Sequence, residues 1–237
     1  TVRPFRASYL FAFNNVNMDN WTETYSNGFY LNYLAQWPDM ALTAVAAHSD
    51  RMMGYVLGKT EGRVPAKGRA SAEEMTLHGH VTAVTVAPEY RRLGVAQMLM
   101  DFFEVVSEHV YHAYFVDLFV RPSNEKAVGM YEKRGYSVYR KVHAYYRGSA
   151  PGAMEDGFGT SFCSHRHAQA ASPRRQGADG AQEWAQCRRA ARVRTCANTG
   201  RPSSHPTYIL AYRLLRRLVR RHEILRERLE LGRATHL

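Results

Sequence analysis

The pattern of apolar and polar positions changes from strand-like to helix-like spacing at two successive places in the chain. Residues 81–86 form an apolar run rich in β-branched side chains that stops before a proline, which predicts a buried strand. Residues 97–110 then carry apolar side chains at helical spacing, which predicts a helix. A second apolar run at residues 115–121 and a second helical pattern beginning at Asn124 follow, and Gly135 suits the end of that helix. The order predicts two consecutive strand–loop–helix units.

Shorter segments on both sides of these units add further strands and helices, separated by polar loops. This mixture predicts an α/β or α+β domain in which helices flank a mixed central β-sheet. The expected elements are a strand at 2–6, a helix at 9–16 with Ser8 as its N-cap, a helix at 27–37, a hairpin of strands at 42–47 and 52–59, a polar loop at 62–75, and final strands at 136–139 and 142–146.

A short basic loop joins the first core strand to its helix. It contains Arg91, Arg92 and Gly94, and the helical pattern starts immediately after it. Backbone N–H groups at a helix N-terminus lack partners inside the helix and carry the positive end of its dipole, so such a corner suits a phosphate group. The alternative is an ordinary strand–turn–helix corner with two solvated arginines, and the loop taken by itself is consistent with both.

Two motifs in the core units resemble those of a known family. The loop reads Arg-x-x-Gly-x-Ala from Arg91 to Ala96, and the second unit reads Asn-x-x-Ala-x-x-x-Tyr-x-x-x-Gly-Tyr from Asn124 to Tyr136. Together they resemble the acetyl-CoA-binding core of the GNAT N-acetyltransferases, which implies the GNAT fold. Further segments make the chain similar to the catalytic subunits of N-terminal acetyltransferase B (NatB) complexes over about residues 1–147. These segments lie at 13–17, 22–25, 29–31, 33–38, 78–83, 136–140 and 145–146.

The resemblance implies how acetyl-CoA, the co-substrate, is held. Its pantetheine arm would lie in a gap where the two core strands splay, hydrogen-bonded like an added strand, and a backbone N–H near Val84 or Val86 would stabilise the oxyanion. Tyr131 would point toward the sulfur and act as the acid for the leaving thiolate; a core aromatic at this helix position is the alternative. The residues expected to bind acetyl-CoA are Val84, Val86, Arg91, Arg92, Leu93, Gly94, Val95, Ala96, Asn124 and Tyr131.

The resemblance also implies a peptide substrate that begins Met-Asp, Met-Glu, Met-Asn or Met-Gln. Hydrogen-bond donors would bind the oxygen of its second side chain, and an apolar wall would contact its methionine. His78 and His80 lie two apart on a strand, so both face the same side. The residues expected to bind the peptide are Glu23, Tyr25, Phe29, His78, Gly79, Thr82 and Tyr145.

The group that removes the amine proton is left open between two candidates. A free α-amine titrates near ~7.7–8.0, so a weak base or an ordered water suffices. His80 is one candidate base, and Tyr145 or Tyr146 acting through a water is the other. A histidine that only packs in the core and tyrosines that only pack are the alternatives to both.

The positive charge of the chain is concentrated in its last part. Residues 1–147 carry 16 Lys and Arg against 14 Asp and Glu, whereas residues 148–237 carry 16 Arg, no Lys and 7 acidic residues. A nearly neutral catalytic domain argues against direct nucleic-acid binding by that domain. No apolar run is long enough for a membrane span and the start shows no signal-peptide pattern, so we expect a cytoplasmic protein. We expect no metal, because Cys187, Cys196 and His205 match no common zinc spacing.

The segment after residue 147 differs in composition from the domain before it. Residues 148–206 are rich in Gly, Ser, Ala, Pro and Arg, which predicts a disordered, low-complexity linker. Residues 207–232 carry an apolar stripe with arginines opposite, which predicts a basic amphipathic helix. Such a helix either packs on its own domain or meets a partner groove, an anionic membrane or RNA. A shifted reading frame is another explanation of this basic, largely non-homologous tail.

The resulting functional hypothesis is transfer of acetyl from acetyl-CoA to the α-amine of protein N-termini, by direct attack in a ternary complex. By resemblance, a large helical-repeat auxiliary subunit completes the enzyme, which acts on nascent polypeptides at or near ribosomes. Apolar residues of the first two helices, such as Leu10, Tyr30 and Leu34, are the candidate contact. Two alternatives stay open: a GNAT-fold subunit that binds CoA or a partner without turnover, and a small-amine acetyltransferase.

Overall fold

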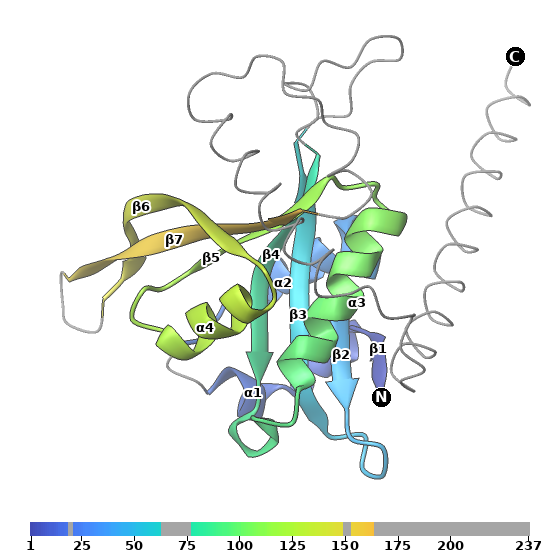
Figure 1. Cartoon of the computed structure of the whole chain (residues 1–237). Helices are drawn as coiled ribbons and strands as arrows, with labels where there is room; N and C mark the ends of the chain where they lie inside the picture. The colour runs from blue at the N-terminus through green and yellow to red at the C-terminus, as the bar shows by residue number, and fades with distance from the viewer. Residues whose placement is uncertain (19–20, 63–76, 149–152, 164–237) are drawn as a thin grey trace, which may run out of the picture.

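The computed structural model describes residues 1–18, 21–62, 77–148 and 153–163, which form one seven-stranded sheet with helices on both faces (Figure 1). The strands lie in the order β1-β2-β3-β4-β5-β7-β6. β4 and β5 run parallel and the other neighbouring pairs are antiparallel, so the predicted mixed sheet is confirmed. The strands are β1 (Val2–Pro4), β2 (Ala41–Val45), β3 (Met52–Glu61), β4 (His78–Val86), β5 (Phe115–Val120), β6 (Ser137–Arg147) and β7 (Met154–Cys163).

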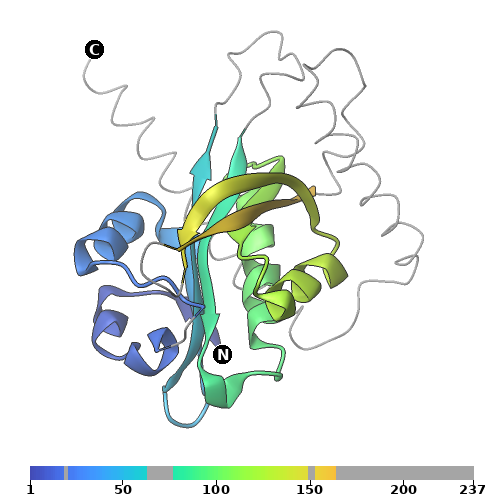
Figure 2. The same ribbon diagram turned by 90° about the vertical axis from the view of Figure 1, so that its left-hand side faces the viewer.

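Two sets of helices cover the two faces of the sheet. Figure 2 shows α1 and α2 on one side, and α3 and α4 on the other. Each side has its own cluster of buried side chains, one packed around α3 and the other around the aromatic residues near α1 and α2. The helices are α1 (Asn14–Asn17), α2 (Asn27–Gln36), α3 (Val95–His109) and α4 (Glu125–Lys133), with short 3-10 helices η1 (Ala7–Phe11), η2 (Pro38–Met40) and η3 (Pro88–Tyr90).

The central helix α3 packs closely on the sheet because two glycines face it. Its buried residues Leu99, Phe103 and Val106 follow helical spacing, as the sequence pattern predicts. A Cβ on Gly58 of β3 would lie 2.4 Å from the Phe103 ring, and a Cβ on Gly79 of β4 would lie 2.5 Å from Ser107 Oγ. Side chains at these two positions would push the helix away from the strands.

The two core strands separate part way along their length. β4 and β5 are paired from His78 opposite Phe115 to Val81 opposite Leu118, and no pairing continues beyond that point. Figure 1 shows β5 turning away from β4. The predicted gap between the two strands therefore exists in the structure, and it leaves one edge of β4 open.

The N-terminal helix expected at 9–16 is interrupted. The chain forms the 3-10 helix η1, turns at Ala12, and then forms the short α1. Ser8 is not an N-cap, because that position of η1 belongs to Arg6 and has no side-chain hydrogen bond. The break lets Phe13 enter an aromatic cluster, with ring centroids 6.3 Å from Phe5 and 5.3 Å from Tyr30. Tertiary packing thus overrides the helical spacing here.

The end of the domain also differs from the prediction. Residues 137–147 form one irregular strand, β6, and not two, and its hairpin partner is β7, which lies between β5 and β6. β7 falls inside the segment expected to be a disordered linker from residue 148, so that expectation is wrong for 154–163 and the sheet continues past residue 147. The glycines that suggested disorder are positions where β7 lies close to side chains of β6. A Cβ on Gly157, for example, would lie 3.1 Å from Tyr145.

The rest of the tail lies outside the described residues. This includes most of the linker expected at 148–206, the helix expected at 207–232, and Cys187, Cys196 and His205. Among the helices in the described part of the chain, none combines the length and the apolar character needed to cross a membrane.

Candidate active site

A cleft of about 1000 Å³ opens where β4 and β5 separate. It is bounded by the open edge of β4, the loop before α3, the first turns of α4, the segment before α2 and the end of β6. Most of the residues selected from the sequence line this cleft. They are Glu23, Tyr25, His80, Thr82, Val84, Val86, Arg91, Arg92, Gly94, Val95, Ala96, Asn124, Tyr131, Tyr145 and Tyr146.

A bulge in β4 shapes one wall of the cleft. Leu57 pairs with Ala83 and Gly58 pairs with Val81, so Thr82 is the extra residue. The Thr82 hydroxyl donates a hydrogen bond of 3.1 Å to Tyr33 Oη on α2. Beyond the bulge β4 has no partner on its β5 side, so backbone groups of that edge face the cleft. An open strand edge suits a ligand that carries amide groups.

The loop before α3 turns sharply and leaves the helix N-terminus without a side-chain cap. Arg92 and Gly94 have positive φ angles of 66° and 76°, and Gly94 occupies the N-cap position. No side chain accepts a hydrogen bond there, so backbone N–H groups of the first turn stay available for an anion. The residues present therefore fit the phosphate groups of acetyl-CoA.

The side chains of the same loop point to different surroundings. Arg91 Nε donates to the Val86 carbonyl oxygen at 3.2 Å, which holds this side chain against the end of β4. Leu93 is 67% exposed and does not line the cleft. Val95 is buried and fixes the start of α3 in the core.

The α4 wall supplies Asn124 and Tyr131. Asn124 is the N-cap of α4, and its Oδ1 accepts a hydrogen bond of 3.2 Å from the Ala127 N–H. Tyr131 is 5% exposed, and its ring centroid lies 5.6 Å from that of Tyr136. Burial raises the pKa of Tyr131, so the phenol is protonated at neutral pH.

The other end of the cleft is lined by aromatic side chains. Tyr25 stacks on Phe29 with a centroid distance of 4.1 Å, and Phe29 itself lies behind Tyr25 and outside the cleft lining. Burial, and next the charge of Glu23, raise the pKa of Tyr25 to about 12. Tyr145 and Tyr146 meet edge to face at 4.8 Å. These residues form an apolar wall that carries hydroxyl donors.

Arg121, at the end of β5, connects the segments of this wall and was not selected from the sequence. Its guanidinium bonds Glu23 and Glu155 and donates to the Arg147 carbonyl oxygen at 2.9 Å. It also lies 4.3 Å from the centroid of the Tyr146 ring. Its position at the end of a buried strand was the one feature of the sequence that could have marked Arg121 as a site residue. Its partners lie 98, 34 and 26 residues away along the chain, so no local pattern indicates them.

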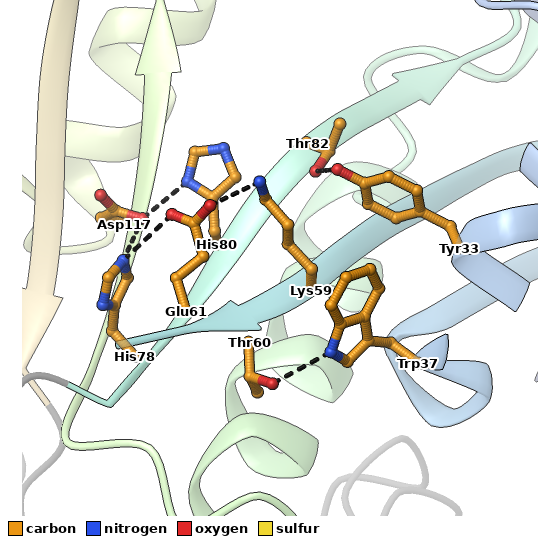
Figure 3. Close-up of polar contacts among 9 residues, drawn as sticks. All are labelled: Tyr33, Trp37, Lys59, Thr60, Glu61, His78, His80, Thr82 and Asp117. Carbon is orange, nitrogen blue, oxygen red and sulfur yellow. Dashed lines mark hydrogen bonds and ion pairs between the residues drawn. The ribbon is translucent and has the colours of Figure 1, made fainter. Parts of the chain in front are cut away.

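A polar network of histidine and carboxylate side chains connects β3, β4 and β5 (Figure 3). His80 Nδ1 is 2.8 Å from Oδ1 of Asp117, a buried residue of β5 that the sequence reasoning also missed. His78 Nε2 lies 3.6 Å from carboxylate oxygens of both Asp117 and Glu61. The prediction that His78 and His80 share one side is confirmed.

Besides Phe29, two residues expected at the peptide site lie outside the cleft. His78 stacks on Phe115 with ring centroids 4.6 Å apart and does not line the cleft. Gly79 faces α3 on the opposite side of the sheet, because side chains alternate along a strand. Gly79 is therefore not among the residues that line the cleft, and its place is a close approach between strand and helix. In the described segments, no group of three or more His, Cys, Asp or Glu side chains is arranged to hold a metal ion.

Comparison with known proteins agrees with this architecture. Residues 10–136 match the acetyltransferase (GNAT) family. The chain is 51% identical over 148 residues to the N-alpha-acetyltransferase 20 of Dictyostelium discoideum, which covers 62% of this chain and 79% of that protein. It is 47% identical over 152 residues to the N-terminal acetyltransferase B complex catalytic subunit of Arabidopsis thaliana, covering 64% of this chain and 81% of that protein.

Solved structures give the same relationship. Naa20 of Chaetomium thermophilum, in complex with a bisubstrate analogue, matches with a TM-score of 0.63 and 40% identity, covering 75% of this chain and 93% of that chain. A NatB acetyltransferase complex bound to a bisubstrate inhibitor matches with a TM-score of 0.59 and 34% identity, covering 68% and 88%. The chain belongs to the acetyltransferase (GNAT) family and, within it, to the NatB catalytic subunits.

Proposed function

We propose that the chain transfers acetyl from acetyl-CoA to the α-amine of protein N-termini that begin Met-Asp, Met-Glu, Met-Asn or Met-Gln, by direct attack in a ternary complex. The observation that carries this proposal is a single cleft with an uncapped helix N-terminus at one end and an aromatic, hydroxyl-bearing wall at the other. The first end suits phosphate groups and the second suits a peptide, so both substrates have room along the open edge of β4.

The backbone of β4 and of the loop before α3 would hold acetyl-CoA, which supplies the activated acetyl group as a thioester. Backbone N–H groups at the open edge near Val84 and Val86 are suited to stabilise the oxyanion that forms at the acetyl carbon. Tyr131 is suited to donate a hydrogen bond to the sulfur. Since burial raises its pKa further above the ~8.5 of an ordinary thiol, full proton transfer from Tyr131 to a thiolate is uphill, and hydrogen-bond donation is its favoured role.

The peptide would enter at the aromatic wall. Tyr25, backed by Phe29, offers an apolar surface for the methionine side chain. Tyr25 and Tyr145 carry hydroxyl groups in the cleft that can donate to a carboxylate or amide oxygen of the second residue, whereas the Thr82 hydroxyl already donates to Tyr33 Oη. Preference for Asp, Glu, Asn and Gln at that position would follow, because an aliphatic second residue leaves these donors without acceptors.

We further propose that a large helical-repeat auxiliary subunit covers the side of the sheet that carries η1, α1 and α2, and that the enzyme works in the cytoplasm on nascent chains near ribosomes. Apolar side chains exposed there support this surface: Phe11 is 90% exposed and Leu31 is 46% exposed. Leu10 and Leu34 are half-buried and stay in the proposed contact. Tyr30 is removed from it, because it is 1% exposed and packs inside the aromatic cluster.

The test is acetyl transfer to Met-Asp, Met-Asn and Ser-Ala peptides and to a polyamine, by the full chain with and without an auxiliary subunit. We expect turnover on Met-Asp and Met-Asn only, with kcat reduced roughly 10-fold or more in Tyr131→Phe. Turnover on the polyamine alone would identify a small-amine acetyltransferase. CoA binding without turnover under both conditions would identify a subunit that binds but does not catalyse.

A further inference from the structure

A buried carboxylate behind the peptide end of the cleft connects three strands. Asp117 on β5 is 4% exposed, and its two oxygens have different partners. Oδ1 lies 2.8 Å from Nδ1 of His80 on β4, while Oδ2 accepts a hydrogen bond of 3.0 Å from the Tyr139 hydroxyl on β6. His80 and Asp117 are register partners in the parallel ladder, so strand pairing itself sets the imidazole beside the carboxylate.

Tyr139 reaches Asp117 across an intervening strand. β7 lies between β5 and β6, and Gly159 of β7 is next to the tyrosine. A Cβ at Gly159 would lie 3.1 Å from Cζ of Tyr139, which is tighter than an ordinary contact. The absent side chain thus lets the hydroxyl cross β7 and occupy the second carboxylate oxygen, which leaves Oδ1 for His80.

The arrangement defines which nitrogen of His80 carries a proton. Burial alone would favour a protonated Asp117, but the hydrogen bond and charge of His80, followed by His78 and Tyr139, lower the pKa of Asp117 below its ordinary value. An ionised carboxylate only accepts hydrogen bonds, so Nδ1 of His80 must be the donor. In the neutral imidazole Nε2 is then an acceptor. Figure 3 shows this second nitrogen directed away from Asp117, and His80 lines the cleft.

We propose that Asp117 is a positioning residue that holds the proton of His80 on Nδ1, so that Nε2 accepts the proton of the substrate amine. This rests on the proposed function. In the step, a bond forms between the amine nitrogen and the acetyl carbon, the thioester C–S bond breaks with its electron pair on sulfur, and the amine proton moves to Nε2. The sulfur gains one proton from solvent and His80 returns one to solvent, so the products are the acetylated peptide and the free thiol.

The test is a set of kinetic constants for Asp117→Asn, His80→Gln and the double variant, with a Met-Asp peptide and the auxiliary subunit present. An asparagine can donate to Nδ1 and so favours the other tautomer, in which Nε2 carries the proton. We expect kcat to fall roughly 10²-fold in Asp117→Asn with both KM values unchanged within about twofold. The double variant is expected to be no slower than His80→Gln alone, because both changes remove one function.

Tyr139→Phe is the matched control, because it removes the other hydrogen bond to the same carboxylate without changing the partner of His80. We expect a loss in kcat of no more than roughly threefold there. If Asp117 only supported the fold, Asp117→Asn would raise the KM values, and its loss in kcat would multiply with that of His80→Gln. Such multiplication, or full kcat in Asp117→Asn, would overturn the inference.

A second measurement does not depend on whether Asp117→Asn folds. Nitrogen-15 NMR of the full chain labelled in histidine, with His80→Gln for assignment, reports the tautomer directly. The inference requires the proton on Nδ1 in the neutral ring, and a proton on Nε2 would overturn it. A wild-type chain that acetylates no peptide with its auxiliary subunit would instead contradict the proposed function, which separates the two failures.

Discussion

The two ends of the cleft are built in different ways. The end proposed to bind acetyl-CoA is lined mainly by one segment of the chain, between Val84 on β4 and Ala96 at the start of α3, with Asn124 and Tyr131 beside it. The end proposed to bind the peptide is lined by residues from separate segments, with Glu23 and Tyr25 from the segment before α2, His80 from β4 and Tyr145 from β6. Conformation is therefore the critical property at the first end, and the relative position of distant segments is critical at the second.

This difference indicates which changes should affect one substrate and spare the other. Backbone strain in the loop before α3 should weaken CoA binding. Loss of the contacts made by Arg121, which holds Glu23, Glu155 and Tyr146 together, should weaken peptide binding. A change that loosens the contact between α3 and α4, which both border the cleft, should instead lower the free energy of unfolding.

The largest expected effect is on stability. Arg134 at the end of α4 bonds Glu104 and Asp101 of α3, each at 2.8 Å, and its side chain is 6% exposed. Arg134→Ala leaves the Glu104 carboxylate, which is 14% exposed, with only the Tyr136 hydroxyl. We expect a loss of about 3–5 kcal/mol in the free energy of unfolding, measured by chemical denaturation. Lys133→Ala, at an exposed neighbour, is the control, and a loss below about 1 kcal/mol for Arg134→Ala would contradict the structural role.

The next effect separates the cofactor end from the peptide end. Gly94 has a φ of 76°, and a Cβ there meets nothing within 4 Å, so a side chain acts through strain and not through a clash. A left-handed conformation costs a residue with a side chain roughly 1–2 kcal/mol, so Gly94→Val should raise the Kd for CoA about 10-fold. Gly28→Ala on α2 is the control. An unchanged Kd for CoA, measured by calorimetry, would show that the turn does not have to be left-handed.

The matching change at the peptide end is Arg121→Ala. Removing the guanidinium frees Glu23, Glu155 and the Tyr146 ring together. We expect the KM for a Met-Asp peptide to rise roughly 10-fold, with the KM for acetyl-CoA unchanged. Arg140→Ala removes the same charge from an exposed position on β6 and serves as the control. Equal increases in both KM values would contradict the separation of the two ends.

The smallest effect concerns acid stability. The pKa of Asp117 is lowered in the folded chain, so its ionisation stabilises the fold above the unfolded value near ~3.9 and this contribution is lost as the pH falls through the lower folded value. The free energy of unfolding should therefore fall more steeply between about pH 5 and pH 3 in the wild type than in Asp117→Asn. Parallel pH profiles from denaturant titrations would argue against an ionised Asp117.

The sequence predicted the elements around the proposed cofactor end better than the contacts at the proposed peptide end, because the first depend on local signals and the second on distant segments. Strand, turn and helix signals from Val84 to Ala96 are local, and the structure has the expected elements there. Asp117 and Arg121 read as parts of an apolar strand, and their roles depend on partners that only the sheet brings near.

Glycine gave the other error. Gly157 and Gly159 contributed to the prediction of a disordered segment after residue 147. Both are positions where β7 passes under side chains of β6. Composition does not distinguish a glycine required by close packing from one in a flexible linker, so the strand was missed.

The most direct measurement of the central claim, that one cleft holds both substrates with separable ends, is the affinity of a bisubstrate analogue. CoA joined to a Met-Asp peptide should bind the full chain, with its auxiliary subunit, roughly 100-fold or more tightly than CoA alone. Arg121→Ala should weaken the analogue and leave CoA unchanged, while Gly94→Val should weaken both. Equal affinities for CoA and the analogue, or equal weakening of both by Arg121→Ala, would contradict the account.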